Sequence, residues 1–327
     1  MRRALITVAV VIALSGLFIP TTEASEKPLV VASIGPIASI VREAFGDSVD
    51  VVTLIPLGAD PHEYQLSAEQ VNLLRGASVI VTTGGHLPVE AKIAELKEEG
   101  VIKAEVLLID DYRAEGFRYL PERWYNDKDN PHGVWLDPDN ALAIARATEK
   151  ALEGVDPGNA DKYRAGFESF RVKVEAIKEA YAGFLEGNKS AVVNMPPVQY
   201  AVEWLGIKVV ASIKPEEEVP ALGVDDLLPT AERSDLVLYS LQSPEQLKKA
   251  AFELAEKSGK PTGGVVVFWE GKPYTEILKE NTVSVLKAAG EKVIVQKNSG
   301  GTDSAYILSA LFAGLALGTA LGYILKS

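Results

Sequence analysis

The chain has 327 residues, a formal net charge of −12 and no cysteine. So acidic a chain is not typical of a nucleic-acid-binding protein, and its negative charge favours the attraction of cations. Without cysteine, the sequence offers no disulfide, no thiolate metal ligand and no thiol for attachment of a lipid. The length allows two domains of ordinary size.

The N-terminus has the pattern of a secretory signal. A basic start, Met1-Arg2-Arg3, precedes an apolar run over residues 4–19 and a small residue, Ala24. This pattern predicts a signal peptide over residues 1–24. The mature protein is then expected outside the cytoplasm.

An N-terminal α/β domain is predicted over residues 25–157, because short β-branched runs alternate there with helical patterns. Strands are expected near residues 29–33, 51–55, 79–83 and 106–109. Helices are expected after Pro36, near residues 67–70, after Pro88 and at Asp139. Apolar strands separated by helices are typical of a parallel sheet that is covered on both faces.

A long amphipathic helix is predicted over residues 158–186. Its apolar residues alternate at spacings of four and three, as one face of a helix requires: Tyr163, Phe167, Phe170, Val174, Ile177, Tyr181 and Phe184. The spacing also fits a coiled-coil dimer. Pro157-Gly158 and Gly187 bound the run, however, and favour a single helix packed across two domains.

A second α/β domain is predicted over residues 187–295, with strands near 191–194, 208–212, 236–240 and 265–268. The expected fold class is therefore two similar α/β domains with parallel sheets, joined by a long interdomain helix.

A membrane anchor is predicted at the C-terminus, after a polar linker over residues 296–304. Residues 305–325 are apolar and uncharged, and as a helix they would span about 31 Å of a hydrocarbon core about 30 Å thick. Lys326 favours a cytoplasmic end for this helix, which leaves the two domains outside the cell.

Two of the three histidines follow a proline in similar surroundings. His62 lies in Ala59-Asp60-Pro61-His62-Glu63-Tyr64, and His132 lies in Asn130-Pro131-His132-Gly133-Val134-Trp135-Leu136-Asp137-Pro138. Neutral imidazole is the commonest protein ligand of transition metals, and a preceding proline restricts the backbone that aims the ring. The repeated arrangement predicts a metal-binding role for both histidines.

These two segments resemble the Gly-Ala-Asp-Pro-His and Pro-His-x-Trp-Leu-Asp-Pro signatures of the zinc/manganese-binding solute receptors of ABC transporters. The resemblance runs from about residue 29 to about residue 290. It implies that His62 and His132 bind a metal in a cleft between the domains and that Glu270 closes the site from the second domain. It also implies an ABC permease as partner, with Zn²⁺ or Mn²⁺ as the transported ligand.

The chain departs from the family's pattern at one ligand position, where Met195 replaces a histidine or glutamate. Three alternatives are open: Met195 binds a soft metal, water completes the coordination shell, or His86 takes the vacant role beside an apolar Met195. His86 follows a predicted strand through Gly84-Gly85, and three imidazoles with one carboxylate make a tetrahedral zinc site. The predicted metal ligands are therefore His62, His86, His132 and Glu270.

Other polar residues near these positions are given supporting roles. Asp60, Asp137 and Asp139 are expected to orient an imidazole or cap a helix. Trp135 is expected to pack between the domains. The acidic run Glu216-Glu217-Glu218 is expected to be solvated surface with no ligand role.

The predicted function is a membrane-anchored extracellular receptor, not an enzyme, which delivers zinc, or else manganese, to an ABC permease. The histidine-rich loop common in zinc members of the family is missing, so the choice of metal stays open. The alternatives are a metal-dependent hydrolase and a metal-binding adhesin without a transporter. Against a hydrolase, His62-Glu63-Tyr64-Gln65-Leu66 lacks the second histidine of the zinc-protease helix.

Overall fold

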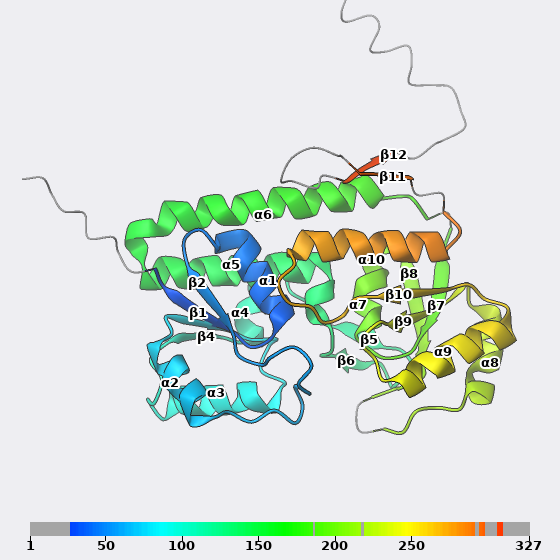
Figure 1. Cartoon of the computed structure of the whole chain (residues 1–327), viewed down its shortest axis with the longest axis horizontal. Coiled ribbons are helices and arrows are strands. Elements are labelled where there is room, and N and C mark those ends of the chain that lie inside the picture. Colours follow the sequence, from blue (N-terminus) through cyan, green and yellow to red (C-terminus); the bar gives the residue numbers. More distant parts are fainter. Residues whose placement is uncertain (1–26, 186, 217–218, 292–293, 298–305, 310–327) are drawn as a thin grey trace, which may run out of the picture.

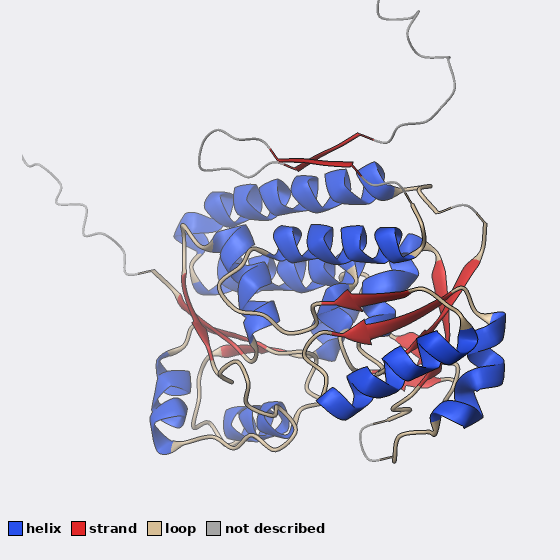
Figure 2. Ribbon diagram, turned by 45° about the vertical axis from the view of Figure 1, so that its right-hand side comes forward, coloured by secondary structure: helices blue, strands red, loops and turns tan. Residues whose placement is uncertain are grey.

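Two parallel four-stranded sheets are bridged by one long helix (Figures 1 and 2). The computed structural model describes residues 27–185, 187–216, 219–291, 294–297 and 306–309. The predicted signal peptide lies outside the described residues. The two sheets and the interdomain helix confirm the predicted α/β fold class.

The first sheet has the strand order β2-β1-β3-β4, and all its pairs are parallel. Its central strands are apolar on both faces, because helices cover both sides of the sheet. The strands are β1 (Leu29–Ala32), β2 (Asp50–Thr53), β3 (Val79–Val81) and β4 (Glu105–Leu107). The helices are α1 (Gly35–Phe45), α2 (Ala68–Gly76), α3 (Pro88–Glu98), α4 (Ile109–Arg113) and α5 (Pro138–Val155).

Local sequence signals explain where these helices begin. Ser67 and Gln70 form a capping box at α2, in which each side chain bonds the other residue's backbone N–H. The Asp137 carboxylate caps α5 by accepting from the N–H groups of Asp139 and Asn140. The capping role predicted for Asp137 is therefore confirmed.

The second sheet has the order β10-β9-β7-β8, again all parallel. Its strands are β7 (Lys189–Val193), β8 (Ile207–Ser212), β9 (Leu236–Ser240) and β10 (Thr262–Val265). Its helices are α7 (Val198–Val202), α8 (Val224–Arg233), α9 (Glu245–Ser258) and α10 (Tyr274–Ala288), and the short 3₁₀ turn η3 (Glu203–Leu205) follows α7.

The strand predicted at residues 265–268 was placed wrongly, because β10 ends at Val265. The strand contains Gly263 and Gly264, which carry no β-propensity signal. Tertiary packing explains both glycines: a Cβ on Gly263 would lie 2.8 Å from Cβ of Ala288, and one on Gly264 would lie 2.7 Å from Cδ2 of Leu241.

A short antiparallel hairpin, β5 (Leu120–Glu122) and β6 (Lys128–Asn130), was not predicted. Although it precedes the interdomain helix in sequence, it fastens to the second domain. Trp124 Nε1 donates to the carbonyl of Pro215 at 2.9 Å, and Arg123 forms an ion pair with Glu203. The hairpin therefore joins the second domain through its side chains, and the 3₁₀ turn η1 (Val134–Leu136) follows it.

The interdomain helix is α6 (Ala160–Tyr181), which follows the 3₁₀ turn η2 (Pro157–Asn159). It packs against α1 and α5 of the first domain and against α10 of the second. Six of its predicted apolar residues are buried within this chain: Tyr163, Phe167, Phe170, Val174, Ile177 and Tyr181. This burial favours the packed interdomain helix over the coiled-coil alternative.

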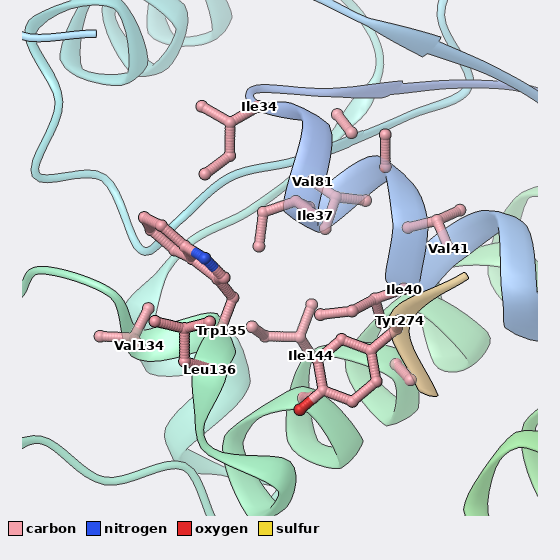
Figure 3. Close-up of a cluster of buried hydrophobic side chains, with 14 of the residues drawn as sticks. Ile34, Ile37, Ile40, Val41, Val81, Val134, Trp135, Leu136, Ile144 and Tyr274 are labelled. Carbon is pink, nitrogen blue, oxygen red and sulfur yellow. The ribbon is translucent and has the colours of Figure 1, made fainter. Parts of the chain in front are cut away.

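The hydrophobic core is continuous between the domains at the start of α10. Figure 3 shows Tyr274 of α10 beside Ile40 of α1 and Ile144 of α5. Next to it, Thr275 donates its backbone N–H and its hydroxyl to the Glu43 carboxylate, at 2.9 and 2.6 Å. A carboxylate at a helix N-terminus is favoured by the helix dipole. The two domains are therefore joined at α1 and α10 by both core packing and hydrogen bonds.

At the C-terminal end, β11 (Ile294–Lys297) pairs antiparallel with β12 (Tyr306–Ser309). The helix predicted over residues 305–325 was therefore wrong at 306–309, since a short apolar run fits a strand as well as a helix when a partner strand is available. Its other residues, and 298–304 of the predicted linker, lie outside the described residues. No helix of the described ranges is long and apolar enough to cross a membrane.

Candidate metal centre

The three histidines lie where loops from separate elements converge. His62 follows β2 and His86 follows β3, both at the carboxyl edge of the first sheet, and His132 lies between β6 and η1. In an open α/β fold, ligands usually bind beyond the carboxyl ends of the strands, where the strand order reverses. The topology thus places His62 and His86 at one sheet edge, and the segment after β6 brings the His132 ring within 5.6 Å of both.

The repeated Asx-Pro-His sequence has a shared local structure. The N–H of His62 donates to Oδ1 of Asp60 at 2.9 Å, and the N–H of His132 donates to Oδ1 of Asn130 at 2.9 Å. Asp and Asn commonly make this turn by accepting from the residue two positions ahead. The turn fixes the backbone at each histidine, and Asp60 acts on the backbone N–H of His62, not on the imidazole as predicted.

The imidazoles form a compact triangle. Their ring centroids are separated by 6.0 Å for His62 and His86, and by 5.6 Å for each of the pairs with His132. One ring nitrogen of each lies within 4.8 Å of the others. Nitrogens of a tetrahedral zinc site lie about 3.4 Å apart, so a small inward rotation would suffice for binding.

Burial and the two neighbouring imidazoles keep His86 neutral. Burial lowers the pKa of His86 to about 3, with further contributions from the nearby His132 and His62 imidazoles and a small opposing effect of Glu216. Neutral imidazole has a free nitrogen lone pair, so His86 is able to accept a metal at neutral pH.

His86 is held from behind by the loop that carries it. Its Nδ1 lies 3.1 Å from the Thr83 hydroxyl oxygen, which in turn donates to Oε2 of Glu90 at 2.8 Å. Glu90 is fully buried on the first turn of α3, and burial raises the pKa of its carboxyl, against the opposing effect of the hydrogen bonds donated to it.

The second domain contributes Glu216, for which the sequence had predicted no ligand role. Its Oε1 lies 3.0 Å from Nε2 of His132, across the cleft. It lies in the loop after β8, and a position just past a strand was the signal that could have identified it. Compositional reasoning missed it because an acidic run is usually solvated.

Behind Glu216 lies a second buried carboxyl group, that of Glu122 at the end of β5. Burial and the neighbouring Glu216 raise the pKa of Glu122 to about 8. Glu122 is therefore mostly protonated at pH 7.

Glu270 does not join the histidines in this structure. It is exposed, five residues beyond the end of β10, and it is not among the residues that line the cleft cavity. Trp135 lies between the domains as predicted, since its Nε1 donates to the carbonyl of Val267 at 2.9 Å and its ring packs on Phe268.

The cleft cavity has a volume of about 730 Å³ and runs from the histidines to the second domain. Met195, Lys214 and Phe268 line its opposite wall, and most of its lining is apolar. Met195 therefore faces the cavity, as either of its predicted roles requires.

The comparisons with known proteins agree with this architecture. Residues 30–288 match the family described as zinc-uptake complex component A, periplasmic. The metal ABC transporter substrate-binding lipoprotein ScbA of Streptococcus cristatus is 30% identical over 188 residues, which are 53% of this chain and 57% of that protein. The manganese ABC transporter substrate-binding lipoprotein PsaA of Streptococcus pneumoniae is 29% identical over 167 residues, 48% of this chain and 51% of that protein.

The chain thus spans about half the length of the curated relatives that it matches. A solved structure of ZnuA shares the fold, with a TM-score of 0.65 and 22% identity over 81% of this chain and 100% of that chain. Because the family match runs through both domains, the protein belongs to the periplasmic zinc-uptake component A family, which consists of solute-binding proteins and not of enzymes.

Proposed function

We propose that this protein is the solute-binding component of an ABC transporter and that its cargo is a divalent transition metal. The observation that carries the proposal is the triangle of His62, His86 and His132 at the cleft. Relatives that are named for metal and manganese ABC transporters support the same role. An ABC permease is the proposed partner, and the side of the membrane opposite the cytoplasm is the proposed location.

Zinc is the proposed cargo, and manganese is the alternative. Three imidazoles and one carboxylate match the tetrahedral nitrogen-and-oxygen site that zinc prefers, whereas manganese favours oxygen-rich, higher coordination. The net charge of −12 adds a general attraction for cations.

Glu216 is the proposed carboxylate ligand, in place of Glu270. The 3.0 Å between Oε1 of Glu216 and Nε2 of His132 is close to the ligand–ligand separation of about 3.3 Å in a tetrahedral zinc site. Metal binding would replace this hydrogen bond with two metal–ligand bonds. A ligand from each domain would also make metal binding hold the cleft closed.

The test is zinc affinity, measured by competition with a chromophoric chelator. His62→Ala and His86→Ala should each weaken binding by at least about 100-fold, and Met195→Leu should change it little, because direct ligands cost more than the 10–100-fold typical of supporting groups. A large loss in Met195→Leu with little loss in His86→Ala would instead indicate a thioether ligand and a soft metal.

The carboxylate assignment is tested by a matched pair. Glu216→Gln should weaken zinc binding strongly, and Glu270→Gln, an equally conservative change at an exposed position, should not. The reverse result would restore Glu270 as the ligand. The partner is tested with the permease reconstituted together with its ATPase subunit, whose ATP hydrolysis zinc-loaded protein should stimulate more than metal-free protein does.

A further inference from the structure

The loop between β3 and α3 is built around a buried carboxylate. Oε1 of Glu90 accepts from the N–H of Thr83 at 2.7 Å, and Oε2 accepts from the Thr83 hydroxyl at 2.8 Å and from the N–H of Gly85 at 3.0 Å. Gly85 has a φ of +94°, a conformation that strongly favours glycine. The loop that presents His86 is thus closed onto one side chain.

The single hydrogen of the Thr83 hydroxyl determines which atom donates in its contact with Nδ1 of His86. The Thr83 hydroxyl has a single hydrogen, and the carboxylate of Glu90 takes it. Toward His86, 3.1 Å away, the Thr83 oxygen is therefore only an acceptor, and Nδ1 of His86 must carry the proton. The lone pair of the neutral ring then lies on Nε2.

Burial raises the pKa of Glu90, and three donated hydrogen bonds oppose this shift. Hydrogen bonds from two backbone N–H groups and one hydroxyl stabilise its charged form. An amide at the same position would bring an NH₂ group next to donors, where it would have no acceptor.

We propose that Glu90 and Thr83 are positioning residues that hold His86 in the Nδ1–H tautomer, so that Nε2 is the atom offered to the metal. This inference rests on the proposed role of His86 as a ligand. Groups that hydrogen bond to the second nitrogen of a metal-binding histidine commonly fix its tautomer and orientation. Here the carboxylate acts through an intervening hydroxyl.

The first test is made on metal-free protein, because the ¹⁵N chemical shifts of His86 report which nitrogen is protonated. Wild-type protein and Thr83→Ser, which keeps the hydroxyl, should have the proton on Nδ1. Thr83→Val keeps the branched shape but lacks the hydroxyl, and it should show a mixture of tautomers. A proton on Nε2 in the wild-type protein would overturn the proposal.

The second readout is zinc affinity in the same variants. Thr83→Val should bind zinc about 10–100-fold more weakly than wild type, and Thr83→Ser should restore most of the loss. The matched control is Thr282→Val, because the buried Thr282 hydroxyl donates to the carbonyl of Leu278 within α10, away from His86. Equal affinities for Thr83→Val and Thr83→Ser would contradict a positioning role.

The outcomes separate this proposal from the proposed function. If His86→Ala binds zinc as wild type does, the ligand role fails, whichever tautomer is found. If His86→Ala loses affinity but the tautomer does not respond to Thr83→Val, the ligand role stands and the positioning role fails. If Thr83→Val does not fold, the wild-type tautomer still decides the question.

Discussion

Replacing Gly133 with alanine should weaken both the fold and the metal centre. Gly133 follows His132 directly and has a φ of +80°, in the left-handed region. An added Cβ would lie 2.6 Å from Cα and 2.8 Å from the carbonyl oxygen of Pro197, in the second domain. Because these are backbone atoms, no side-chain rotation relieves the overlap.

The expected loss has two parts. An alanine in the left-handed conformation costs about 1–2 kcal/mol, and forcing an extra methyl group into a packed region costs about 1–3 kcal/mol more. Gly259→Ala is the matched control, since Gly259 has a φ of +67° and nothing within 4 Å of the added Cβ. Gly259→Ala should lose only the stability that the left-handed conformation costs an alanine.

The assay is urea unfolding of metal-free protein, followed by zinc titration of each variant. Gly133→Ala should exceed Gly259→Ala in destabilisation by about 1–3 kcal/mol, and it alone should weaken zinc binding, because the backbone of His132 must shift. Equal losses of stability and unchanged zinc affinity in both variants would refute the close approach of the domains at Pro197.

Three further predictions follow from other parts of the structure. The pKa of His86 falls from 6.5 to about 3 on folding, so the unfolded chain binds more protons than the folded chain between these pH values. Metal-free protein should therefore lose stability as the pH falls through this range. His86→Gln should reduce that loss, measured as the urea midpoint of unfolding at several pH values. On α6, Phe170→Ala should cost about 3–5 kcal/mol and the exposed Val172→Ala less than about 0.5 kcal/mol by the same assay; similar costs would contradict the packing of this helix. Trp135→Phe leaves the carbonyl of Val267 without its donor and should cost about 1–3 kcal/mol, whereas a stability equal to wild type would mean that water replaces the indole N–H.

Local signals in the sequence determined most elements of the two domains. The alternation of apolar strands with helices gave both parallel sheets, because hydrophobic periodicity is a property of the residues themselves. The spacing of aromatic residues from Tyr163 to Tyr181 identified α6 for the same reason. The Asx-Pro-His turns are also local, so the sequence alone marks His62 and His132 as a related pair.

Contacts between distant segments decided what the sequence left open. The side chains of Ala288 and Leu241 leave no room for a Cβ at Gly263 and Gly264 of β10. The hairpin at residues 120–130 is held by partners in the second domain. At residues 306–309, pairing with β11 made a strand of an apolar run that by itself also fits a helix.

For the metal centre, the sequence supplied the three imidazoles but not the acidic partner. Glu216 and Glu270 both follow strands of the second sheet, and the acidic run that contains Glu216 is typical of solvated surface. Only the folded cleft brings Glu216 within 3.0 Å of His132 and leaves Glu270 exposed. A residue's type and turn are local properties, but the distance between two ligands depends on how the domains pack.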